Sequence, residues 1–109
     1  MPSISGNLSV AANARSANLI AGDLYEFLPA ASTVAIYLTG SAAGLQADVS
    51  LGGQTLAQAF VVAPTNRFPL REEDGVVVAG GVPGERLFIS ALNTTGGALT
   101  INWLVDILA

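Results

Sequence analysis

Leu45-Gln46-Ala47-Asp48-Val49-Ser50-Leu51 is the stretch that decides the fold class of this 109-residue chain. Its odd positions are all apolar and its even positions are all polar. A period of two is typical of a strand with one face buried and the other in water. The dipeptide Gly52-Gly53 follows directly and favours a turn. The residues around position 50 therefore predict a half-buried strand that ends in a turn.

The same alternation continues outward from this stretch in both directions. Residues 33–39 place Val34, Ile36 and Leu38 on one face of a second strand. Further strands are expected over residues 4–10, 55–62, 76–79, 86–92 and 99–107. Turn-forming residues separate these runs at 39–41, 74–75, 80–84 and 93–97.

Three segments of this pattern need separate interpretation. The runs 76–79 and 86–92 are so continuously apolar that both are predicted to be buried on both faces or nearly so. Residues 11–21 form either a weak Ala-rich helix or a short turn or loop, and residues 17–28 are a less certain strand.

Short strands with Gly-rich turns at intervals of roughly 8–12 residues are typical of sandwiches and related folds. The sequence therefore predicts an all-β fold, a single β-sandwich or jelly-roll-like domain of seven to eight short antiparallel strands over residues 1–109. Trp103 lies on the apolar face of the last strand with Ile101 and Val105. We predict that it is a core residue and not a platform for a sugar ring.

Composition excludes several classes of function. The chain has no Cys and no His, so thiolate and imidazole chemistry are absent, and no cofactor or metal is expected. Its four cations, all arginines, are too few and too scattered for nucleic acid, and the net charge is −4. No signal-peptide pattern and no apolar run of ~18–20 residues is present, which predicts a soluble chain that is not exported and does not bind a membrane.

Charged residues make up only 11 % of the chain, whereas about a quarter is usual for a soluble domain. A surface with so few charges is either covered by small polar residues or hidden against neighbouring molecules. We therefore expect the chain to function in an assembly.

The densest charge lies in the irregular stretch of residues 63–75. Arginines flank an acidic run there, and a segment of mixed sign is suited to pairing with a neighbouring copy in register. The residues that we predict to form an interface are Arg67, Phe68, Arg71, Glu72, Glu73 and Asp74.

No catalytic residue is expected, although two carboxylate pairs need mention. Asp23 with Glu26, or Glu72 with Asp74, match the residue types that glycoside hydrolysis requires. The run from Glu72 to Gly75 also invites a calcium interpretation, but it lacks the spacing of a known calcium loop. For Asp23 and Glu26 the favoured interpretation is a solvated loop or strand edge, and for the run from Glu72 to Gly75 it is a solvated loop that ends in a turn. The chain is predicted not to be an enzyme.

The overall profile resembles the small decoration, or cement, proteins of tailed bacteriophages and related viruses. The stretches that carry the resemblance are Pro2–Asn7, Leu51–Leu56 and Leu99–Trp103. The resemblance implies a structural virion protein, made in the host cytoplasm, that binds the major capsid protein on the outside of the shell. It also implies a homo-oligomer, with a trimer favoured, and it transfers no functional residue.

Two further classes of function stay open from the sequence. The alternative is a soluble β-sandwich module of a phage fibre or a bacterial protein that binds carbohydrate or a cell-surface ligand, for which exposed aromatic residues in a cleft would be the sign. An enzyme that uses carboxylates alone would need two close acids, at least one with a raised pKa.

Overall fold

The computed structural model describes residues 3–23 and 25–108 of the chain. In these residues it contains seven strands, all pairing antiparallel, in two sheets, and no helix, so the predicted all-β fold is confirmed and is consistent with a seven-stranded β-sandwich. The strands are β1 (Ser3–Val10), β2 (Ser32–Gly40), β3 (Leu45–Leu51), β4 (Gln54–Val61), β5 (Gly75–Gly81), β6 (Leu87–Asn93) and β7 (Leu99–Leu108). Each predicted strand is present, with ends that differ by one or two residues.

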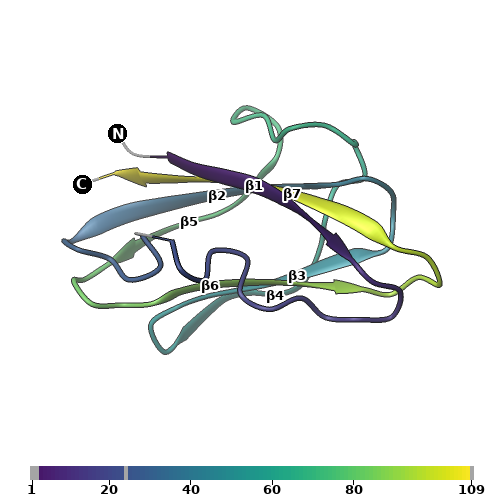
Figure 1. The fold of residues 1–109 in the computed structure, drawn as a ribbon. Helices are drawn as coiled ribbons and strands as arrows, with labels where there is room; N and C mark the ends of the chain where they lie inside the picture. Colours follow the sequence, from purple (N-terminus) through teal and green to yellow (C-terminus); the bar gives the residue numbers. More distant parts are fainter. Residues whose placement is uncertain (1–2, 24, 109) are drawn as a thin grey trace.

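The two sheets lie one above the other (Figure 1). Sheet A has the strand order β1-β7-β2-β5, and sheet B has the order β4-β3-β6. The first and last strands are neighbours, with Ser3 opposite Asp106 and Val10 opposite Leu99. Both ends of the described chain therefore lie at the same end of the molecule (Figure 1).

The core fills the space between the sheets with the residues that the period of two predicts. In β3, every odd position from Leu45 to Leu51 is buried, and Val34, Ile36 and Leu38 of β2 are buried with them. Trp103 packs against this cluster but is only partly buried, so its predicted core position is confirmed in part. Gly6 lies under the ring, because a Cβ atom there would sit 2.7 Å from Trp103 Cζ2.

The prediction that 76–79 is a fully buried strand is wrong. β5 is an edge strand that pairs only with β2, and the side chain of Val78 is 67 % exposed. β6 is buried on its inner face, where Leu87, Ile89 and Ala91 lie in the core. A run of valines therefore marks a strand here, but the position of that strand in the sheet decides how deeply it is buried.

Residues 11–28 form no helix in the part that the structure describes; the chain runs in irregular form along the outer edge of β6. Backbone hydrogen bonds join Ser16 N to Ala91 O (2.7 Å) and Leu19 N to Ile89 O (2.8 Å). The buried Asn18 side chain donates to Leu87 O and accepts from the backbone N–H of Ile89. Asparagine competes with helical backbone bonds in this way, which explains why the Ala-rich stretch is a loop.

Candidate interaction surface

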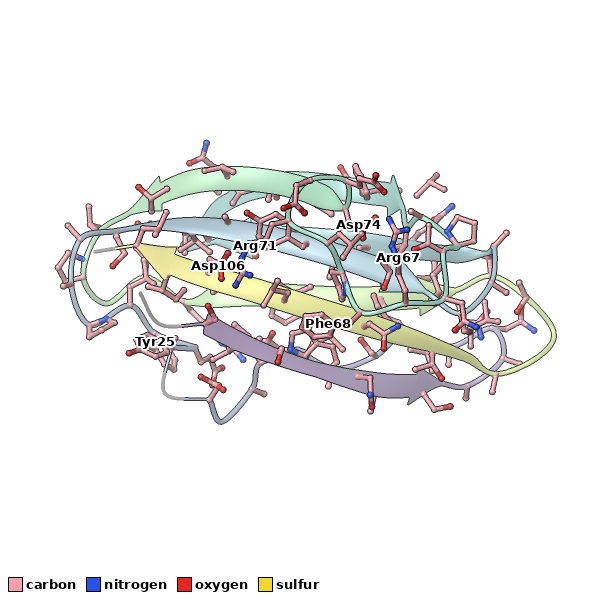
Figure 2. All side chains as sticks on the ribbon, turned by 90° about the horizontal axis from the view of Figure 1, so that it is seen from above. Tyr25, Arg67, Phe68, Arg71, Asp74 and Asp106 are labelled. Atoms are coloured by element: carbon pink, nitrogen blue, oxygen red, sulfur yellow. The ribbon has the colours of Figure 1, made fainter. Side chains whose placement is uncertain are left out.

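The predicted interface stretch lies across the outer face of sheet A, where residues 63–74 form a loop that we call the cover loop (Figure 2). Three backbone hydrogen bonds hold it to β2: Gly40 N to Ala63 O (2.9 Å), Asn66 N to Gly40 O (2.9 Å) and Leu38 N to Asp74 O (3.2 Å). In addition, the side chains of Thr39 and Asn102 donate to the carbonyl oxygen of Arg67. The loop is therefore fixed at both ends and near its middle.

Arg67 closes the cover loop on itself. Its guanidinium lies 2.7 Å from a Glu73 oxygen and 3.3 Å from Asp74 Oδ1. Asp74 is buried and also accepts a hydrogen bond from the Leu70 backbone N–H at 2.7 Å. The hydrogen bond with Asp74 is the main reason why the pKa of Arg67 is raised, so the guanidinium stays charged at all ordinary pH values.

Arg71 fastens the cover loop to β7 through Asp106. Its Nε and Nη2 atoms reach the two carboxylate oxygens of Asp106 at 2.7 and 2.9 Å, a bidentate pair. The Asp106 side chain is only 4 % exposed, and Ser3 Oγ of β1 donates to it at 2.6 Å. Arg71 is the main cause of the lowered pKa of Asp106. One carboxylate thus joins β1, β7 and the loop.

The six predicted interface residues are therefore close together in one loop, but their charges do not point outward in the way the sequence predicts. The sequence predicts pairing of Arg67 and Arg71 with a neighbouring copy, whereas both have carboxylate partners within the chain. Glu72 is exposed. Any contact that the loop makes with another molecule then falls mainly to Phe68, which lies between the two arginines and is 55 % exposed.

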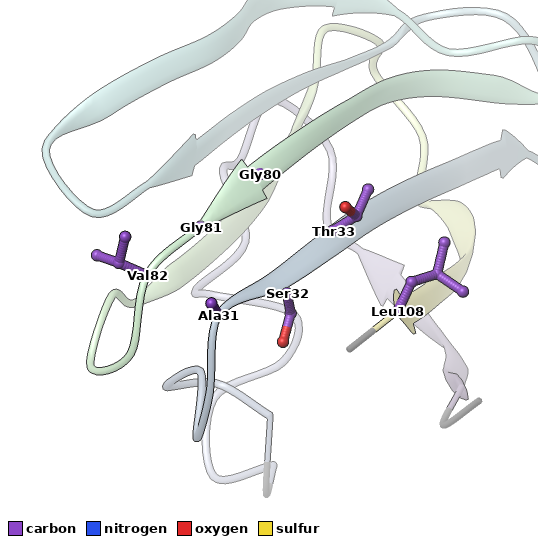
Figure 3. A pocket seen from close by; sticks show the side chains of 7 residues that line it. All are labelled: Ala31, Ser32, Thr33, Gly80, Gly81, Val82 and Leu108. Carbon is purple, nitrogen blue, oxygen red and sulfur yellow. The ribbon is translucent and has the colours of Figure 1, made fainter.

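Sequence reasoning missed several exposed apolar residues of the cover loop, of the edge strand β5 and of the segments at the end of sheet A. Leu70 of the cover loop is 41 % exposed, and Val78, Val82 and Leu108 are also exposed. The last two, together with Ala31, Ser32, Thr33, Gly80 and Gly81, line a shallow depression of about 440 Å³ at one end of sheet A (Figure 3). We call the exposed apolar residues Phe68 and Leu70 of the cover loop the docking face. The sequence alone does not show whether an apolar residue in a loop or in an edge strand is buried or exposed. That depends on how the strands are arranged in the sheet.

One carboxylate of each predicted pair, Glu26 and Asp74, is bonded within the chain. Asp23 is exposed, as predicted, but the solvated interpretation is wrong for Glu26, which is buried and accepts from Gly22 N (2.8 Å) and Arg86 Nε (2.7 Å). These bonds, with that from Gly22 the larger cause, lower the pKa of Glu26, whereas an acid catalyst needs a raised one. Asp74 is likewise buried and not solvated. Residues 3–23 and 25–108 contain no group of three acids placed to hold a metal ion.

The outer face of sheet B carries a smaller depression of about 260 Å³, lined by Asp48, Val49, Ser50, Thr55, Gln58 and Phe88. β4 is irregular beside it, because Ala59 has a positive φ of 52° and its N–H donates to Asp48 Oδ1 at 2.8 Å. That hydrogen bond, and to a lesser degree Arg15, lowers the pKa of Asp48. Ser50, Thr55 and Gln58 contribute polar side chains to its lining.

Within the described ranges no helix is long and apolar enough to cross a membrane. Comparison of the chain with models of protein families, with curated proteins and with solved structures found no match.

Proposed function

We propose that the chain is a structural decoration protein of a virion, which binds the major capsid protein on the outside of the shell through the docking face. The observation that carries the proposal is the state of the cover loop: both of its arginines are paired within the chain, and Phe68 and Leu70 are left exposed on a loop that is already held in place. In this proposal the protein is made in the host cytoplasm, forms a homo-oligomer and catalyses no reaction.

Two physical arguments support a docking role for this loop. An ordered loop loses little conformational entropy when it binds, so more of the contact energy appears as affinity. Aromatic side chains at the centre of an interface commonly carry a large share of the binding energy. Many identical copies on one shell would, in addition, turn a modest single contact into strong retention.

The first test replaces Phe68 with Ala and measures co-sedimentation with shells of the virus whose genome encodes the protein. We expect the apparent affinity to fall by at least ~30-fold, which corresponds to the roughly 2 kcal/mol of an interface hot spot. Phe27→Ala is the matched control, because Phe27 is 54 % exposed but lies beside Arg86 near sheet B. If Phe68→Ala co-sedimented with the shells as strongly as Phe27→Ala, the proposal would be contradicted.

The depression on sheet B favours a second candidate, a module that binds a neutral sugar. Phe88 offers an aromatic surface there, and Ser50, Thr55 and Gln58 offer hydrogen bonds to hydroxyl groups. The test is titration with maltose, lactose, cellobiose and chitobiose, followed by amide NMR. We expect a bound sugar to shift the amide signals of these residues in the natural protein and to leave them unchanged in Phe88→Ala. Unchanged spectra at millimolar sugar would rule this candidate out.

A further inference from the structure

The sandwich has four outer strand edges, and three of them carry a feature that hinders pairing with another chain. Residues 13–23 and 25–28 lie along the edge of β6 and cover it. β4 has a break in its pairing with β3 at Asp48 and a positive φ at Ala59. The pairing of β5 with β2 shifts between Ile36 and Tyr37. Bulges, breaks and covering segments are the means by which proteins prevent sheets from joining edge to edge.

β1 has none of these features in the part of the chain that the structure describes. It pairs with β7 through eight consecutive residue pairs without a shift, and none of its residues has a positive φ. It contains no charged residue and no proline, and the Ser3 hydroxyl is bonded to Asp106 at the strand's first described residue. The outer edge of β1 is therefore a straight, ordered and uncharged row of backbone donors and acceptors.

We propose that this edge pairs with β1 of a second copy, antiparallel and about a two-fold axis at Gly6, so that sheet A continues across two molecules. This inference deepens the proposed function, since it names the surface of self-association. A strand that pairs with itself about a two-fold axis makes a closed contact between two copies. The unit is then a dimer and not the trimer that the family resemblance implies.

The side chains match best in the register that places Gly6 opposite Gly6 of the second copy. Ile4 then lies opposite Leu8 of the second copy on the inner face, and it covers a side chain that is 42 % exposed in the single chain. On the outer face, Ser5 lies opposite Asn7 of the second copy, and both are exposed polar residues without charge. No like charges face each other in this register.

The position of Trp103 supplies a signal for this contact. Its ring covers Gly6, and it is the only tryptophan of the chain. Because Cα atoms directly opposite each other in antiparallel strands lie about 4.5–5.5 Å apart, the two rings come close to the two-fold axis. Dimer formation is therefore expected to change tryptophan emission with protein concentration.

The register is tested with cysteines, since the natural chain has none. Antiparallel pairs have the Cα separation that a disulfide needs. Under oxidation, a mixture of Ser5→Cys and Asn7→Cys proteins is expected to give a linked dimer, and each variant alone is expected to give much less. The proposed register would be overturned if each variant alone gave as much linked dimer as the mixture, or if the mixture gave no linked dimer.

The pairing itself is tested by the mass of the native protein in light scattering. We expect a dimer that the double variant Ser5→Lys/Asn7→Lys weakens at least ~10-fold, because four ammonium groups then face each other across the axis. The control Gln54→Lys/Gln58→Lys adds the same charge to the edge of β4 and is expected to leave the dimer intact. A monomer, a trimer or a dimer insensitive to the β1 lysines would refute the proposal.

The two proposals can fail separately. A protein that dimerises through β1 but does not bind shells would contradict the decoration role alone. A monomer that still binds shells through Phe68 would contradict the β1 pairing alone.

Discussion

Replacing Asp106 with Ala is expected to lower the free energy of unfolding by about 2–3 kcal/mol and to weaken binding through the docking face. The buried carboxylate accepts two hydrogen bonds from Arg71 and one from Ser3, so its removal takes away the ion pair that fastens the cover loop to β7. The expected loss of unfolding free energy is smaller than for a fully buried ion pair, because the Arg71 side chain is half exposed and is hydrated when Asp106 is absent. Denaturant unfolding at neutral pH measures this change in the free energy of unfolding.

The pH dependence of the stability provides a second test of the role of Asp106. Arg71 holds the pKa of Asp106 below its ordinary value of 3.8, so the contribution of the ion pair is present above that value. It is lost as the pH falls through the lowered pKa, where the folded protein also takes up the proton. The difference in stability between the natural protein and Asp106→Ala should therefore narrow below about pH 4.

A matched control for this variant is Glu72→Ala, which removes an exposed carboxylate from the same loop. Surface substitutions of this kind change stability by less than about 0.5 kcal/mol. If Asp106→Ala behaved like Glu72→Ala, the carboxylate would not be the anchor of the cover loop.

Replacing Asn18 with Ala is expected to lower the free energy of unfolding by about 2–3 kcal/mol and to promote aggregation. The side chain donates to Leu87 O and accepts from the N–H groups of Ile20 and Ile89, all in buried surroundings. Its loss leaves these groups without partners and loosens the segment that covers the edge of β6. Thermal unfolding and light scattering during heating measure both effects.

Gln54→Ala serves as the control here, because Gln54 is an exposed amide at the start of β4. It should change neither stability nor aggregation by a measurable amount. Aggregation that rises equally in both variants would show that the covered β6 edge is not the cause.

The self-pairing of β1 and the covering of β6 concern the same physical problem. An open strand edge is a template for pairing, and a protein either hides it or uses it. Here Asn18 lies in the segment that hides one edge, while β1 presents an edge of eight residues without charge or bulge. The contrast between these edges supports an interface role for β1.

The strands of this protein could be predicted from the sequence because their signal is local. Alternation of apolar and polar residues in Leu45–Leu51 and in residues 33–39 reflects one buried face, and each of these segments carries that information alone. The all-β class and the position of Val34, Ile36 and Leu38 in the core followed from it.

What the sequence could not determine depends on residues that are far apart in the chain. Arg71 and Asp106 are separated by 35 positions, and Asn18 and Ile89 by 71, so neither contact leaves a local pattern. The burial of β5 is also set by distant parts of the chain, since Val78 lies on the outer face of a strand at the edge of sheet A. Local periodicity thus determined the strands, whereas strand order decided which charges are paired, which edges are open and which apolar side chains remain in water.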